Sequence, residues 1–260
     1  MSNGKLSGRV AVVTGVGRSI GIGTAICRRL AVEGADIYFT YWTPYDAAMP
    51  WGAESDFPQH LKSELAATGV RVRNLELDLS VPAAPFQLLD AVEAELGTPT
   101  ILVNNAAHST MTPYTELNAD SLDAHYAANV RATCLLSVEF ARRFRGASGG
   151  RIISLTSGQS LGPMPDELAY IATKGAIEAF TMSLAPAVAR RGITVNAVNP
   201  GPVDTGYMTE ELRQTLLPKF PFGRMGRPED AAHLVAFLAS DDGAWITGQV
   251  IHSEGGFRDY

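Results

Sequence analysis

The sequence predicts an α/β protein in which helices cover both faces of one parallel sheet. Short β-branched runs alternate with segments of helical periodicity along the whole chain, which is the pattern of right-handed βαβ crossovers. A glycine-rich turn follows the first of these runs, at the position where doubly wound sheets bind dinucleotides. Because we find no internal repeat and no Gly/Ser linker, we expect a single domain over residues 1–260.

Seven buried strands are expected from their apolar, β-branched composition. The first, Arg9–Thr14, reads RVAVVT and is closed by Gly15. The others are Asp36–Thr40, Arg71–Leu77, Thr100–Val103, Arg151–Leu155, Ile193–Val198 and Gln249–His252. Together they predict a seven-stranded parallel sheet.

Helices are expected in the intervals between these strands. Gly23–Glu33 carries Ala25, Ile26 and Leu30 at helical spacing and stops at Gly34. The later helices are His60–Thr68, Ala84–Leu96, Ser121–Phe144, Leu168–Arg190 and Pro228–Ala239. Two segments break this rhythm, Tyr41–Phe57 and Gly201–Arg227, and loops of such length are usually functional.

Composition and charge exclude several classes of protein. With 21 Lys+Arg against 27 Asp+Glu, the net charge is −6, and a nucleic-acid partner usually requires a basic surface. No apolar run is long enough to cross a bilayer or to form a signal peptide, so we expect a cytoplasmic protein without a membrane partner. Cys27 and Cys134 have no metal-ligand spacing, and the histidines show no HExxH pattern, so no metal is expected.

A turn dense in glycine separates the first strand from the first helix. Residues 14–23 read TGVGRSIGIG, with Gly15, Gly17, Gly21 and Gly23. A backbone without Cβ atoms turns tightly and approaches a pyrophosphate closely, while N–H groups of the helix meet its charge. A plain strand-to-helix turn would need only one or two glycines, and no GK[ST] follows, so we favour a dinucleotide over a phosphate loop.

Three positions bear on the choice of dinucleotide. An NAD site calls for an acidic residue at the end of the second strand, where this chain has Tyr41 and no carboxylate. Arg18 in the glycine turn either meets a 2′-phosphate through charge-assisted bonds or is an ordinary surface arginine. Asp78, which ends the third strand, either accepts from an adenine amino group or caps the following segment. We therefore favour NADP, with NAD as the alternative.

Four polar residues form a candidate catalytic group. Tyr170 and Lys174 are one helical turn apart, so the phenol and the ammonium face the same space. A free phenol has a pKa near 10, and a nearby positive charge lowers it. Ser157 ends the fifth strand, where its hydroxyl can bond a substrate carbonyl, and Asn129 is a polar amide inside a long helix, suited to holding a water.

Together these motifs resemble the short-chain dehydrogenases/reductases over nearly the whole chain. Ser157 precedes Tyr170 by thirteen positions, as the pattern of that family expects. The other motifs are the glycine turn, Leu77-Asp78-Leu79, Asn104-Asn105-Ala106-Ala107, Asn129, Tyr170-x-x-x-Lys174, Asn199-Pro200-Gly201, Ile246-Thr247-Gly248-Gln249 and Gly255-Gly256. The chain is most similar to the branch of 3-oxoacyl-carrier-protein reductases and related carbonyl reductases.

The resemblance implies a Rossmann fold and hydride transfer between a nicotinamide cofactor and a carbonyl or secondary alcohol, with a 3-oxoacyl thioester as one candidate substrate. Tyr170 would exchange the proton with the carbonyl oxygen, which Ser157 polarises. Lys174 would lower the pKa of that phenol and bind the nicotinamide ribose, and Asn129 would hold a relay water. The family also suggests a homotetramer. Cofactor contacts are expected at Gly15, Arg18, Ile20, Gly21, Gly23, Tyr41, Asp78, Leu79, Asn105, Ala106, Tyr170, Lys174, Pro200, Gly201, Val203 and Thr205.

The chain departs from the family pattern in the glycine turn, where five residues separate Gly15 from Gly21, two more than usual. The longer turn is similar to that of divergent enoyl-carrier-protein reductases, but those have a Tyr–Lys spacing of seven, and position 177 is Ile177. The inserted segment Tyr41–Phe57 either covers the adenosine end or packs on the surface.

Two rival functions remain. A serine hydrolase is suggested by the GxSxG match around Ser160, although Pro163 and Pro165 favour a loop over a nucleophile elbow. A catalytically silent dinucleotide-binding protein on the same fold is the other alternative, since fold does not determine function.

Overall fold

One parallel sheet of seven strands runs through the protein, in the order β3-β2-β1-β4-β5-β6-β7. The structure is a computed structural model that describes residues 4–257. The strands are β1 (Val10–Val13), β2 (Asp36–Tyr41), β3 (Val72–Glu76), β4 (Ile101–Asn104), β5 (Gly150–Leu155), β6 (Ile193–Asn199) and β7 (Val250–His252). The predicted seven-stranded, doubly wound α/β fold is confirmed, whereas the single domain over residues 1–260 stays a prediction.

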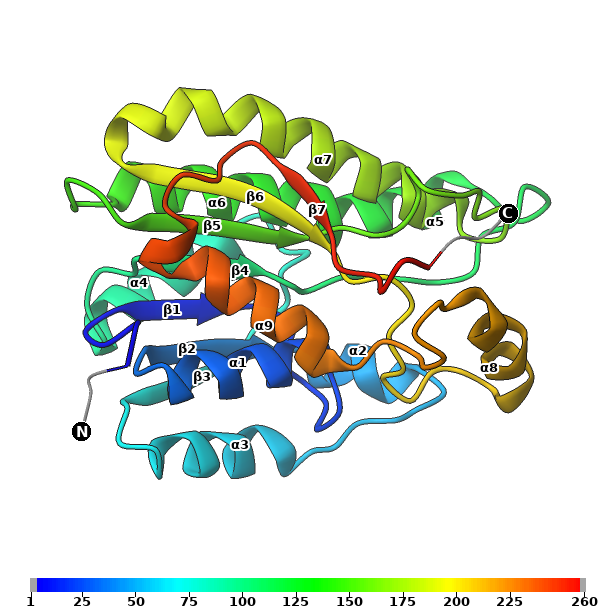
Figure 1. The fold of residues 1–260 in the computed structure, drawn as a ribbon, viewed down its shortest axis with the longest axis horizontal. Coiled ribbons are helices and arrows are strands. Elements are labelled where there is room, and N and C mark those ends of the chain that lie inside the picture. Colours follow the sequence, from blue (N-terminus) through cyan, green and yellow to red (C-terminus); the bar gives the residue numbers. More distant parts are fainter. Residues whose placement is uncertain (1–3, 258–260) are drawn as a thin grey trace.

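Helices connect successive strands and cover both faces of the sheet (Figure 1). Those on one face, α1, α3 and α9, share one buried apolar cluster, and α4, α6 and α7 share the other. The helices are α1 (Ile22–Val32), α2 (Thr43–Ala48), α3 (Phe57–Ala66), α4 (Ala84–Glu95), α5 (Ala119–His125), α6 (Ala132–Arg143), α7 (Leu168–Val188), α8 (Glu210–Leu216) and α9 (Pro228–Ala239), with short 3₁₀ turns at Ala189–Arg191, Leu217–Lys219 and Asp241–Gly243.

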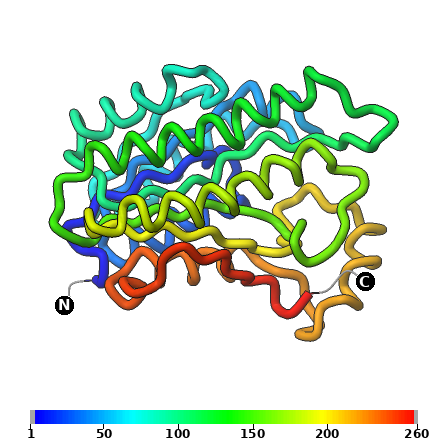
Figure 2. Tube along the Cα trace, turned by 90° about the horizontal axis from the view of Figure 1, so that it is seen from above, coloured from blue at the N-terminus to red at the C-terminus, as the bar shows by residue number. Residues whose placement is uncertain are grey.

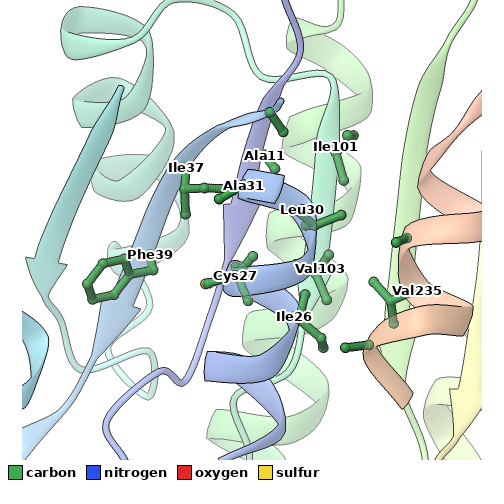
Figure 3. Packing of buried hydrophobic residues seen from close by; sticks show 14 of the residues in the cluster. Ala11, Ile26, Cys27, Leu30, Ala31, Ile37, Phe39, Ile101, Val103 and Val235 are labelled. Atoms are coloured by element: carbon green, nitrogen blue, oxygen red, sulfur yellow. The ribbon is translucent and has the colours of Figure 1, made fainter. Parts of the chain in front are cut away.

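The packing of α1 shows why the helical spacing of its apolar residues produces these layers. Ile26 and Leu30 lie on the same side of the helix and point onto the sheet, next to Val103 of β4 and Val235 of α9 (Figure 3). All four side chains are fully buried, and each such burial contributes about 1.5–3 kcal/mol of hydrophobic free energy. Gly34, with φ +92°, then turns the chain from α1 into β2.

Four predicted segments differ from the structure. The helix expected over Ser121–Phe144 is continuous but contains a π-helical stretch, Tyr126–Arg131, between α5 and α6. The helix expected at His60 begins at Phe57, because Pro58 suits a first helical turn. The segments Tyr41–Phe57 and Gly201–Arg227, expected as loops, contain the short helices α2 and α8.

The irregular segments lie beside the carboxyl ends of the strands, at one end of the molecule. In Figure 1, α2, α5 and α8 lie at this end, and Figure 2 shows the same grouping from above. The strand order reverses between β1 and β4, so the crevice of a doubly wound fold lies here. Within residues 4–257, no helix is long and apolar enough to span a membrane, and no three His, Cys, Asp or Glu side chains are grouped as metal ligands.

Candidate active site

Tyr170 and Lys174 lie in the first two turns of α7, beside the carboxyl end of β5. The Lys174 Nζ atom is 5.4 Å from the centroid of the Tyr170 ring, so the two groups face the same space as their spacing predicts. Ser157, two residues beyond β5, hydrogen-bonds the phenol oxygen of Tyr170. The structure therefore brings the hydroxyl, the phenol and the ammonium of the predicted catalytic group together.

The Lys174 ammonium is buried, and within residues 4–257 it makes a single hydrogen bond. It is 4% exposed and donates to the Leu155 carbonyl at 2.8 Å. Burial lowers the pKa of Lys174 to about 8, and no carboxylate in the described part of the chain offsets this desolvation. An ammonium carries three protons, so two remain to bind an acceptor that enters the site.

The Tyr170 phenol is held in its neutral form. Burial raises the pKa of Tyr170, and the negative charge of Glu167 raises it further, while the hydrogen bond from Ser157 opposes both. In this structure desolvation therefore raises the pKa of Tyr170, and the lowering expected from Lys174 is not seen. A neutral phenol is the protonation state that a proton donor to a carbonyl needs.

Asn129 lies in the π-helical stretch and its amide is bonded to protein on both sides. Its Oδ1 accepts from the His108 backbone N–H at 2.7 Å, and its Nδ2 donates to the His108 carbonyl at 2.9 Å and to the Thr173 hydroxyl at 3.0 Å. The extra residue of a π-turn is a frequent feature of functional sites. Asn129 thus fixes the segment after β4 against α7, and its predicted role of holding a relay water stays a prediction.

The glycine turn packs closely against the segment that follows β4. Gly15 has φ +73°, and a Cβ there would stand 2.5 Å from the Ala106 Cα. Asn105 donates its side-chain amide to the carbonyls of Thr14 and Gly15, at 2.8 and 2.9 Å. A Cβ at Gly23 would stand 2.7 Å from the same amide nitrogen. These glycines are therefore required by close packing, and Asn105 shapes the turn.

Arg18 points toward the loop after β6. Its guanidinium donates to the Thr205 carbonyl at 2.9 Å and to the Thr205 hydroxyl at 3.2 Å. Ile20, which is 54% exposed, meets Gly206 of the same loop. A cavity of about 460 Å³ opens beside this contact, between the start of α1 and that loop, and Gly21 lines it. The structure thus brings the predicted cofactor residues of the glycine turn next to Thr205, the predicted cofactor residue in the loop after β6.

The remaining predicted cofactor residues lie at the carboxyl end of the sheet. Tyr41 ends β2 half-buried, and Leu79 is half-buried after β3. Asp78 accepts from the Ser80 backbone N–H at 2.8 Å, which closes a local turn before α4 and does not cap that helix, whose N-cap is Ala83. The others follow β6: Pro200, then Gly201, whose φ is +67°, and the buried Val203. Their roles toward a cofactor stay predictions.

Sequence reasoning missed residues of the inserted segment. Tyr45, Asp46 and Trp51 contact the glycine turn or the segment after β4, and Asp46 is only 9% exposed. The aromatic and proline content of Tyr41–Phe57 was the available signal, but it did not indicate which surface these side chains cover. The segment packs on the crevice end of the sheet.

The residues suit a nicotinamide dinucleotide. Lys174 is a buried cation with free protons for ribose hydroxyls, the neutral phenol of Tyr170 lies beside it, and α1 begins at the glycine turn with Gly21 as its N-cap. The serine hydrolase alternative does not fit. Ser160 is exposed in a turn, five residues after β5 and eight before α7, so it does not form a nucleophile elbow.

Fold and site together define an oxidoreductase built on a doubly wound sheet. Residues 15–258 match the family described as Enoyl-(Acyl carrier protein) reductase. The chain is 52% identical to the uncharacterized oxidoreductase YjdA of Bacillus subtilis (strain 168), over 96% of each chain. It is 37% identical to the 3-oxoacyl-[acyl-carrier-protein] reductase FabG of Pseudomonas aeruginosa, over 96% of this chain and 98% of that protein.

Solved structures agree with these relatives. A short-chain dehydrogenase from Burkholderia cenocepacia J2315 in complex with NADP superposes with a TM-score of 0.86 at 33% identity, covering 97% of this chain and 98% of that chain. The chain belongs to the short-chain dehydrogenase/reductase family.

Proposed function

We propose that this protein is an NADP(H)-dependent carbonyl reductase that interconverts a carbonyl compound and the corresponding secondary or primary alcohol. The observation that carries the proposal is the group made by Ser157, Tyr170 and Lys174, in which a hydroxyl bonds a neutral phenol beside a buried ammonium. A bound nicotinamide cofactor supplies the hydride to the carbonyl carbon. The protein chain supplies the proton to the carbonyl oxygen and orients the reacting groups.

Each side chain has a separate task in this proposal. Tyr170 donates its phenolic proton to the carbonyl oxygen as negative charge develops there, and the Ser157 hydroxyl donates a hydrogen bond to the same oxygen. Lys174 binds ribose hydroxyls with its two free protons and stabilises the phenolate that remains. Asn129 holds the segment after β4 against α7, so that Tyr170 keeps its place.

The substrate class rests on the position of the proton donor. A phenol one helical turn from the ammonium is suited to protonating a carbonyl oxygen, and the similarity to a 3-oxoacyl reductase supports a 3-oxoacyl thioester as one candidate. NADP is favoured over NAD because a structural neighbour is a complex with NADP and because Arg18 lies in the glycine turn. A homotetramer and a cytoplasmic location are also part of this proposal.

The test is a spectrophotometric screen of the purified protein against ketones, aldehydes and 3-oxoacyl thioesters, with NADPH and NADH as separate reductants. We expect consumption of NADPH with at least one carbonyl, and its loss in Tyr170→Phe. Tight dinucleotide binding without turnover of any carbonyl would favour the catalytically silent alternative.

A further inference from the structure

The chain that leaves β5 is bonded to α7, the helix that carries Tyr170 and Lys174. The carbonyl of Leu155, the last residue of β5, accepts from the Lys174 ammonium at 2.8 Å. Two residues further on, the Ser157 hydroxyl bonds the Tyr170 phenol. The Thr156 N–H donates to a carbonyl of β6 at 2.9 Å, at the end of the ladder with that strand. Side-chain bonds must therefore hold Ser157, which lies beyond the sheet.

Glu178 supplies such bonds from the side of the helix. It lies one helical turn beyond Lys174, on the same face of α7. Its Oε1 accepts from the Gln159 amide at 2.6 Å and from the Thr156 hydroxyl at 3.1 Å. Thr156 comes directly before Ser157, and Gln159 follows the serine by two residues. One carboxylate oxygen therefore bonds the chain on both sides of the serine.

The amide of Gln159 has only one suitable orientation. Its Nε2 donates to Glu178 and also to the Thr156 hydroxyl at 3.3 Å. Its Oε1 is buried and has no hydrogen-bond partner within residues 4–257, which costs free energy. Reversing the amide would place this oxygen against the Glu178 carboxylate, where both atoms are acceptors. The charge-assisted bond to Glu178 therefore determines how the loop after β5 sits on α7.

The charge of Glu178 does not act on the neighbouring ammonium. The lowered pKa of Lys174 follows from burial alone, without an opposing effect of any carboxylate in the described chain. Both hydrogen bonds of Glu178 within residues 4–257 go instead to the loop after β5. The side chain is half-buried between the helix and this loop. Its contribution to the site is thus the placement of the loop.

We propose that Glu178 is a positioning residue, whose carboxylate fixes the chain on both sides of Ser157 and so keeps the serine hydroxyl against the Tyr170 phenol. This inference rests on the proposed function, because it assumes that Ser157 bonds a carbonyl oxygen beside the proton donor. Such chemistry depends on geometry, and a displacement of about 1 Å at the reacting groups lowers the rate by about 10²-fold.

The experiment measures the single-turnover rate of NADPH oxidation with a carbonyl that the wild type reduces, with enzyme in excess over NADPH so that slow variants stay measurable. Glu178→Ala should lower this rate by about 10- to 100-fold. Its Kd for NADPH, from fluorescence titration, should stay within about twofold of the wild type, because Lys174 keeps its own bond to Leu155. Glu178→Gln keeps an acceptor oxygen and should stay within about threefold of the wild-type rate. Ala and Gln both favour a helix, so α7 persists in both variants.

A control and a double variant make the test specific. Glu93→Ala removes another half-buried glutamate, near the end of α4 and before the start of β4, which is the opposite end of the sheet from the site. Its rate should equal that of the wild type. In a Ser157→Ala background, adding Glu178→Ala should lower the rate by less than about twofold, because no serine hydroxyl is left to misplace.

The outcomes separate the two proposals. If the wild type turns over no carbonyl, the proposed function fails and this inference fails with it. If the wild type is active and Glu178→Ala keeps its rate within about twofold, or loses the same factor with and without Ser157, the inference is overturned while the proposed function stands. A Kd for NADPH that rises by as much as the rate falls would assign the effect to Lys174 and also overturn it. Gln159→Met removes the donor on the loop side and must lower the rate in the same way; it serves as the test if Glu178→Ala does not fold.

Discussion

The Lys174 ammonium predicts a fall in activity on the alkaline side of neutrality. Its pKa is lowered to about 8 by burial, so the free protein loses this charge at a pH where an exposed lysine keeps it. As the pH rises from about 7 to about 9, the charged fraction falls from about ten elevenths to about one eleventh, which is a tenfold loss. Tyr170 stays protonated over this range, because its own pKa is raised.

The measurement is the pH profile of kcat/KM for the dinucleotide, since this quantity reports groups of the free enzyme. If the ammonium must be charged to bind the ribose, kcat/KM should fall about tenfold between these two pH values. Lys174→Arg is the matched variant, because a guanidinium stays charged throughout the range. The kcat/KM of Lys174→Arg should be lower than that of the wild type, but it should not change with pH on the alkaline side.

Two results would refute this reasoning. A wild-type profile that is flat up to pH of about 9 would show that the charge of Lys174 is not needed for cofactor capture. An alkaline fall that persists in Lys174→Arg would assign the titration to another group. A fluorescence titration of NADPH at both pH values separates loss of binding from loss of turnover.

Three other changes test the proton donor, the core and the positioning amide. Tyr170→Phe removes only the phenolic proton, so turnover should fall by about 10²–10⁴-fold while fluorescence titration still shows cofactor binding; unchanged turnover would reject the role. Leu30→Ala, at a fully buried side chain, should lower the free energy of unfolding by about 2–5 kcal/mol in a denaturant titration, whereas Val32→Ala, 68% exposed, should change it by less than about 0.5 kcal/mol. Asn129→Ala removes three hydrogen bonds and should lower both Tm and kcat, and a wild-type kcat would contradict its positioning of the segment after β4.

The sheet could be predicted because its signals are local. Each of the first six strands is a short run followed by a helical segment, and right-handed crossovers then leave few possible topologies. The errors lie where the local signal is ambiguous. The π-helical stretch at Tyr126–Arg131 has the same apolar period as the helices around it, and α2 is too short to show a period.

The catalytic group was predictable for a similar reason. Tyr170 and Lys174 share a helix, so their relation follows from 3.6 residues per turn. The partners of Asn129 were not predictable, because His108 and Thr173 come from other elements. The balance that raises the pKa of Tyr170 was also out of reach, since it depends on how much water reaches the phenol and on Glu167 beside it.

The sequence by itself therefore determined the layers, the order of strand and helix, the glycine turn and the pairing of the phenol with the ammonium. These features depend on neighbours within a few residues of one another along the chain. Only the tertiary structure decided what Tyr41–Phe57 covers, because the contacts of Asp46 with Gly17 and of Tyr45 with Ser109 join residues 29 and 64 positions apart. Long-range contacts of this kind form only when the sheet brings the carboxyl ends of β1, β2 and β4 together, and no local pattern encodes them.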